Sequence, residues 1–230
     1  MVELGDLREG LMPADINKTI KQLLKLKGIK MVGVGTNLAC MGGITPDTNK
    51  MKQLSAIATS IEQDFGIKLL IVSGGNSANY DWFVGTKNPG RINNLRLGES
   101  IYLGRETLNR KPIPGLFLDA FTLVAEAIES KTKPSRPYGN SGQDAFGNSP
   151  VFQDKGLMNR VLLGLGLQDV LVSGLTPLSD VHILAASSDH IALDAGNTQL
   201  KVGQEVSFSL NYSALLSAMT SPYITKAILD

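Results

Sequence analysis

Short apolar runs alternate with longer amphipathic segments through the first half of the chain. The predicted strands are 1–4, 29–34, 69–72 and 94–97, and the predicted helices are 13–27, 46–65 and 79–84. In the first helix Ile16, Ile20 and Leu23 recur at helical spacing on one face, and Pro13 suits the first turn. Strands that alternate with helices are typical of βα units on a parallel sheet.

The pattern changes after about residue 108. A long β-type run at 116–128 is followed by a segment at 132–152 that is rich in Gly, Pro, Ser and Asn and predicts an extended loop. Short strand candidates follow at 160–165, 170–172, 182–185, 190–193 and 205–210. This pattern predicts an antiparallel β domain. We therefore expect two domains, 1–108 and 109–230.

Four βα units are half of a (β/α)8 TIM barrel. The expected fold class is thus α/β, a partial (β/α)8 barrel followed by a C-terminal antiparallel β domain. A half-barrel exposes two strand edges and the inner face of its sheet. Because the first predicted strand begins at Met1, we expect earlier strands to belong to a missing segment. A full barrel takes about 250 residues, so that segment would hold on the order of 125.

Composition narrows the function classes. The chain has 230 residues, 43% of them hydrophobic, which is enough to bury a core. Lys and Arg number 22 against 21 Asp and Glu. The chain therefore has no strong electrostatic field that would attract nucleic acid. We find no apolar run of membrane-spanning length and no signal pattern, and expect a cytoplasmic protein. Cys40 has no partner for an internal disulfide and reads as a loop residue rather than a nucleophile, and His182 and His190 alone make no metal site.

Two consecutive predicted strands end in small residues. The segment 72–77 (VSGGNS) and the segment 93–100 (NNLRLGES) each offer free backbone N–H groups, and the second carries Arg96 just before a glycine turn. Main-chain donors and a serine hydroxyl can bind a phosphate without a lysine-bearing loop. The sequence therefore predicts a site for a phosphate-bearing cofactor.

Six strings in one order carry a family resemblance. They are 1–10 (MVELGDLREG), 33–43 (GVGTNLACMGG), 72–79 (VSGGNSAN), 94–99 (NLRLGE), 187–190 (SSDH) and 220–223 (TSPY). Together they resemble the C-terminal two-thirds of a pyridoxal-phosphate-dependent amino-acid racemase of the alanine racemase fold (fold type III). The similarity is greatest to the ornithine racemase and "predicted amino acid racemase" branch.

The resemblance implies how pyridoxal 5'-phosphate is held. Arg96 matches the arginine that donates a hydrogen bond to the pyridine nitrogen, which stays unprotonated because an arginine does not give up its proton. The alternative, a surface salt bridge, is disfavoured because Leu95 and Leu97 flank Arg96 and take the other face of the strand. Ser77, with its hydroxyl, matches the phosphate site.

Other positions complete the implied cofactor site. Gly98 and Glu99 match backbone donors to the phosphate, with the Glu99 side chain pointing away. Asn76 either joins the phosphate site or belongs to an ordinary turn. Asn37 stands where alanine-specific members of the family have a histidine near the ring. Arg8 matches an arginine near the phenolic oxygen and the substrate carboxylate, or is an exposed residue beside its acidic neighbours.

Two features depart from the family. Racemisation needs an acid–base group on each face of the reacting carbon. The Schiff-base lysine that supplies one of them has no counterpart here, and Leu167 occupies the position of the opposite-face tyrosine. His190 and Asp189 are the nearest candidates for the second group, although a histidine capping a turn is an equal alternative. Tyr223 either reaches the phosphate or is a core tyrosine.

These observations support three hypotheses. The chain is part of an amino-acid racemase that interconverts L- and D-amino acids, is inactive alone, and works as a homodimer or with a complementing N-terminal half-barrel polypeptide. Alternatively, it is a non-catalytic pyridoxal-phosphate- or phosphate-binding protein. In the third, the half-barrel dimerises to cover its own edges. The sequence does not identify the amino-acid substrate.

Overall fold

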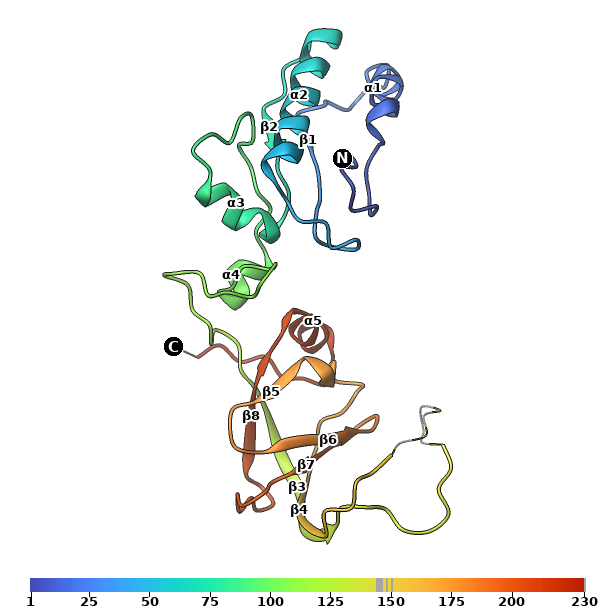
Figure 1. Cartoon of the computed structure of the whole chain (residues 1–230), viewed down its shortest axis with the longest axis vertical. Coiled ribbons are helices and arrows are strands. Elements are labelled where there is room, and N and C mark those ends of the chain that lie inside the picture. Colours follow the sequence, from blue (N-terminus) through green and yellow to red (C-terminus); the bar gives the residue numbers. More distant parts are fainter. Residues whose placement is uncertain (144–146, 148, 150, 230) are drawn as a thin grey trace. The chain divides into compact units, whose positions relative to one another are not determined.

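The computed structural model describes residues 1–143, 147, 149 and 151–229, and the chain divides into two compact units (Figure 1). The N-terminal unit is Met1–Leu118 and the C-terminal unit is Asp119–Asp230. We expected the division after residue 108. Residues 105–112 instead fold back on the N-terminal unit, where Ile113 N–H donates to the carbonyl of Gly104 at 2.8 Å.

The N-terminal unit has two strands and four α-helices. The strands are β1 (Gly33–Gly35) and β2 (Ile71–Ser73), and the helices are α1 (Ile16–Leu23), α2 (Thr48–Phe65), α3 (Tyr80–Gly85) and α4 (Glu99–Leu103). Short 3-10 helices precede α1 at Pro13–Asp15 and α3 at Ser77–Asn79. β1 and β2 pair in parallel, as βα units require.

Helix α2 shows how local sequence sets these elements. The Asp47 side chain accepts a hydrogen bond from the backbone of Lys50 at 2.7 Å and so caps the first turn. Gly66 ends the helix in the left-handed conformation at φ 65°. The buried face of α2 packs with Val34 and Val72, which project from the two strands on the same side.

Two predicted strands are shorter than expected. Residues 1–4 and 94–97 each make a single parallel bridge, Val2 to Leu11 and Ser73 to Asn94, rather than a strand. The first is cut short because the chain turns back at Gly5 and pairs with itself. Val2 N–H nevertheless donates to Gly35 O at 2.8 Å, so both segments flank the β1–β2 pair in the predicted order.

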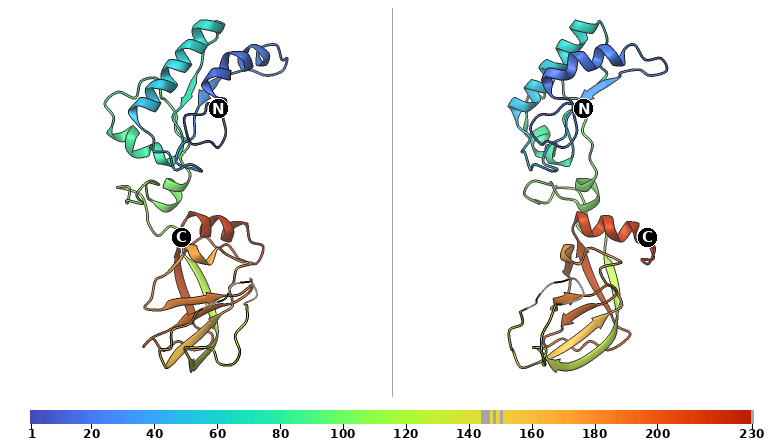
Figure 2. Two further views of the ribbon diagram at one scale, coloured as in Figure 1. Left: turned by 45° about the vertical axis from the view of Figure 1, so that its right-hand side comes forward. Right: turned by 90° about the vertical axis from the view of Figure 1, so that its right-hand side faces the viewer.

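The C-terminal unit contains a six-stranded antiparallel sheet, as predicted (Figure 2). Its strands are β3 (Leu123–Pro134), β4 (Leu157–Leu163), β5 (Leu175–Pro177), β6 (His182–Ala186), β7 (Ile191–Asp194) and β8 (Glu205–Leu210). The spatial order is β5-β8-β3-β4-β7-β6. Alternate residues of these strands form one core, with Phe208 fully buried at its centre.

Several predicted boundaries in this unit were wrong. The β run expected at 116–128 begins at Leu123 and reaches Pro134, because pairing with β4 extends it beyond its apolar part. The strand expected at 170–172 does not form: Val172 instead begins a 3-10 turn, Val172–Gly174, that leads into β5. Helix α5 (Tyr212–Thr220), capped by Asn211, was not predicted. The expected loop at 132–152 includes positions outside the described residues.

No helix of the described chain is long and apolar enough to cross a membrane.

An ion pair on the N-terminal unit ties α2 to the segment before Asn93. Arg91 donates to both oxygens of the Glu62 carboxylate at 2.6 and 2.9 Å, and the Leu69 N–H donates to the same group at 2.7 Å. The Arg91 guanidinium, followed by the Leu69 N–H, lowers the pKa of Glu62 to about 2.

We expect Glu62→Gln to lower the urea midpoint of the N-terminal unit at neutral pH and to lose this effect in acid. The folded pKa lies below the unfolded value of about 4.3, so the stabilisation is present above pH ~4.3 and disappears as the pH falls towards 2. Urea titrations at several pH values measure the difference in midpoint between the variant and the parent chain. The control is Glu126→Gln, an exposed carboxylate of the C-terminal unit. A midpoint difference that persists at pH 2 would contradict the assignment.

Candidate functional site

The Arg96 side chain joins the carboxyl ends of the two parallel strands. Its guanidinium donates to the Ser73 hydroxyl at 2.5 Å, where β2 ends, and to the Thr36 carbonyl at 2.9 Å, just after β1. A longer contact of 3.4 Å reaches the Asn37 side-chain oxygen. Ligands of parallel α/β sheets bind at this end of the strands. The predicted cofactor arginine therefore lies where such a ligand would be.

Three influences act on the pKa of the Arg96 guanidinium. Its partial burial lowers its pKa below the usual arginine value, the negative charge of Glu9 raises it, and the positive charge of Arg8 lowers it. The residue as a whole is nevertheless exposed. Arginine remains protonated in proteins, so its guanidinium offers donors only.

The turn after β2 is held in a narrow set of backbone conformations. Gly75 has φ +142°, and a Cβ there would lie 2.2 Å from the Asn79 side-chain oxygen, so only glycine fits. Asn76 caps the next turn through Ala78 N–H at 2.8 Å and donates to Asn37 at 3.1 Å. The predicted residue Asn76 therefore does have a turn role, and it also places Asn37 beside Arg96.

Four polar groups converge at the start of α4. The buried Ser77 hydroxyl accepts hydrogen bonds from the Gly98 N–H at 3.3 Å and the Ser100 N–H at 3.2 Å, and its oxygen lies 3.1 Å from the Ser100 hydroxyl. We predicted Ser77 and Gly98 but missed Ser100. The signal was present in the sequence, since Ser100 is a second small hydroxyl residue just after the glycine turn.

Glu99 and Arg8 point to other partners. The Glu99 carboxylate pairs with Arg110, so it points away from Ser77 as expected. Arg8 pairs with Glu9 and lies 2.8 Å from the Cys40 sulfur. Arg8 is exposed beside Glu9, and its charge also acts on Arg96.

Asp6 fixes the loop that carries Cys40, a role that sequence analysis missed. Its buried carboxylate accepts the N–H groups of Cys40 at 3.1 Å, Met41 at 2.9 Å and Ile44 at 3.2 Å. Burial alone would raise the pKa of Asp6, but these backbone donors outweigh it and the pKa is lowered.

The remaining predicted residues belong to the C-terminal unit. His190 Nδ1 lies 2.9 Å from an Asp189 carboxylate oxygen, and this contact, followed by the Ser188 hydroxyl, lowers the pKa of Asp189. Leu167 N–H donates to Ser187 O at 2.9 Å, so Leu167 lies beside the same turn. Tyr223 is 70% exposed, so its interpretation as a core residue was wrong.

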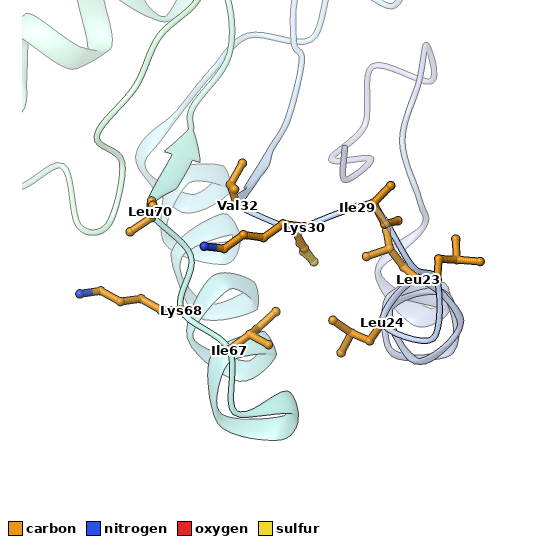
Figure 3. A pocket seen from close by; sticks show the side chains of 10 residues that line it. Leu23, Leu24, Ile29, Lys30, Val32, Ile67, Lys68 and Leu70 are labelled. Carbon is orange, nitrogen blue, oxygen red and sulfur yellow. The ribbon is translucent and has the colours of Figure 1, made fainter.

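A hollow of about 440 Å³ lies at the opposite end of β1 and β2 (Figure 3). Its walls are mainly apolar side chains that precede the two strands, with Leu23 and Leu24 of α1 opposite Ile67. Lys30 and Lys68 also line it, and both precede the strands β1 and β2, whereas Arg96 bonds where these strands end. Neither lysine is therefore placed to reach a ligand at Arg96.

The residues around Arg96 fit pyridoxal phosphate. Arg96 offers a donor suited to a ring nitrogen, while Ser77, Gly98 and Ser100 provide hydroxyls and N–H groups for a phosphate. The buried Asn37 Nδ2 has no hydrogen-bond partner among the described residues. Buried polar atoms are normally satisfied, so an unpaired donor here is consistent with a missing ligand.

Comparisons with known proteins identify relatives of this chain. Residues 1–106 match the family model "Alanine racemase, N-terminal domain". The chain is 44% identical over 233 residues to ornithine racemase of Acetoanaerobium sticklandii, covering 100% of this chain and 66% of that protein. It is 41% identical over 228 residues to lysine racemase of Thermotoga maritima, covering 98% and 64%. The chain thus spans just under two thirds of the curated relatives it matches.

Solved structures support the fold. Alanine racemase from E. faecalis aligns with a TM-score of 0.60 at 16% identity, over 94% of this chain and 59% of that one. D-threonine aldolase from Filomicrobium marinum aligns with a TM-score of 0.60 at 13% identity, over 94% and 55%. The predicted combination of a partial barrel and a β domain is confirmed. The chain belongs to the family of pyridoxal-phosphate-dependent amino-acid racemases of the alanine racemase fold.

Proposed function

We propose that this chain supplies the ring-nitrogen arginine and the phosphate-binding turn of an amino-acid racemase that uses pyridoxal phosphate. The observation that carries the proposal is the Arg96 guanidinium, held by Ser73 and Thr36 at the ends of adjacent strands. The donors around Ser77 belong to the next turn of chain, between β2 and α4. A guanidinium and a phosphate-binding turn on neighbouring segments suit a ligand with a ring and an anionic tail.

When bound, the cofactor supplies a ring that withdraws electrons from the substrate's α-carbon. Arg96 would hold the ring nitrogen as a hydrogen-bond acceptor, since arginine keeps its own protons. Ser77, Gly98 and Ser100 would bind the phosphate, and Asn37 would donate its unpaired N–H near the ring. Arg8 would attract the substrate carboxylate by its charge.

Racemisation also needs two groups that move protons. No lysine is among the described residues that bond to Arg96 or Ser77. The Schiff-base lysine would come from a segment equivalent to the third of the relatives that this chain does not match. For the opposite face we propose His190, with Asp189 orienting it, delivered to the site of a second subunit in a homodimer.

The proposed substrate is an amino acid, and the relatives suggest which class to test first. Ornithine and lysine each have a long side chain that ends in an amine. Because both named racemases are more than 40% identical to this chain, we propose such basic amino acids as its substrates.

We expect the purified chain to bind pyridoxal phosphate reversibly and Arg96→Gln to weaken binding about tenfold or more. A lost hydrogen bond to a charged group costs about 1.5–3 kcal/mol. Equilibrium dialysis with absorbance detection measures the Kd. The control is Arg136→Gln, which removes one exposed arginine of the C-terminal unit. Equal Kd values for the two variants would refute the role of Arg96.

We expect the chain with cofactor alone to show no racemase turnover on ornithine, lysine or alanine. Adding a polypeptide that corresponds to the first third of the ornithine racemase should restore it, because that part would carry the lysine. Chiral chromatography of the products provides the measurement. Cofactor binding without turnover in every combination would instead support the non-catalytic alternative. Turnover by the chain alone would refute the proposal that it lacks the Schiff-base lysine.

We expect His190→Gln in the reconstituted enzyme to abolish deuterium exchange at the α-carbon from one enantiomer and to spare it from the other. Each face has its own proton-moving group, so removing one affects one enantiomer. Proton NMR of each enantiomer in deuterated water follows the exchange. His182→Gln, an exposed histidine on β6, is the matched control. Equal loss from both enantiomers would indicate a structural role for His190.

A further inference from the structure

A second hollow, of about 380 Å³, lies on the C-terminal unit. Its lining comes from four neighbouring strands and the turn after β6, and includes Lys133, Arg160, Leu162, Ala185, His190 and Ala192. The core residues of β4 and β7, such as Val161 and Leu193, take the alternate positions. The hollow therefore lies on the face of the sheet opposite to the core.

Arg160 in this hollow has an unsatisfied donor. Its Nε is buried and has no hydrogen-bond partner among the described residues. The strand register places Asp194 directly across from Arg160, but the Asp194 carboxylate instead accepts the Gly196 N–H at 2.9 Å. A buried unpaired donor is costly, and more so on a cationic group.

The other nearby carboxylate is also occupied. Glu129 stands opposite Leu162, next to Arg160 on the sheet, and pairs with both Lys131 at 3.0 Å and Lys133. The described carboxylates closest in register thus have other partners. Arg160 is left as a guanidinium suited to an external anion.

The remaining wall is apolar and made of small side chains. The register aligns Leu162 with Ala192 and Ala192 with Ala185 across three strands. Side chains as short as alanine leave space above the sheet. A bound water takes roughly 30 Å³, so this hollow holds far more than a bare ion. Its size and apolar wall suit the carbon skeleton of a small organic molecule.

We propose that this hollow binds a small organic carboxylate, with the carboxylate at Arg160 and the carbon skeleton over Ala192 and Ala185. A guanidinium offers a planar pair of donors that matches the two oxygens of a carboxylate. Lys133 and His190 at the rim add positive charge or donors near the anion. The hollow shares His190 with the proposed function, but the test below uses no pyridoxal phosphate and no turnover, so the two proposals can fail separately.

The test is a titration of the full chain, without cofactor, with butyrate. Backbone amide shifts of Ala185 and Ala192 in NMR spectra report binding at the hollow. We expect saturable shifts with butyrate, and at least tenfold weaker binding by Arg160→Gln. Inorganic phosphate should bind more weakly than butyrate, since it gains nothing from the apolar wall.

Two further variants separate a built site from simple charge attraction. Ala192→Leu fills the hollow without changing charge and should weaken butyrate binding at least tenfold. Lys201→Gln removes one exposed positive charge outside the hollow and should leave binding unchanged. Unfolding curves check that each variant is folded. Unchanged butyrate affinity in Arg160→Gln or in Ala192→Leu would overturn the proposal, as would phosphate binding as tightly as butyrate.

Discussion

The candidate site depends on the hydrogen bonds between the Arg96 guanidinium and the ends of two parallel strands. A guanidinium has five donors, and here some are used on the Ser73 hydroxyl and the Thr36 carbonyl. These bonds hold the Arg96 side chain against the ends of β1 and β2. A donor positioned in this way loses little conformational freedom when a ligand arrives, which favours binding.

The polar turns beside Arg96 complete that arrangement. Gly75 permits a backbone path that a side chain would block, and Asn76 links this path to Asn37. Ser77 comes two residues after Gly75, and the Gly98 N–H donates to its hydroxyl. The N-terminal unit thus gathers polar groups at the carboxyl ends of its strands, including the unpaired Asn37 Nδ2, while the apolar hollow with Lys30 and Lys68 lies at the other end.

Periodicity and turn chemistry predicted much of this from sequence. Helix α2 and strand β8 lie close to their predicted ranges, because a capping aspartate and a strict alternation define them locally. Arg96, Ser77 and Gly98 were predicted because glycine turns mark strand ends, and their role towards a cofactor stays a prediction. Asp6 was missed because its role depends on backbone groups more than thirty residues away, which no local pattern reveals. Helix α5 was missed for a different reason, because its apolar residues also suit a strand.

The buried carboxylate of Asp6 links the acidity of the solution to the order of the site. Its backbone donors hold its pKa below the ordinary value, so the loop through Cys40 keeps its anchor at neutral pH and releases it only as acid protonates the group. Arg8 contacts Cys40 on that loop. Strong acid would thus release the loop that carries Cys40, and with it the thiol that Arg8 contacts.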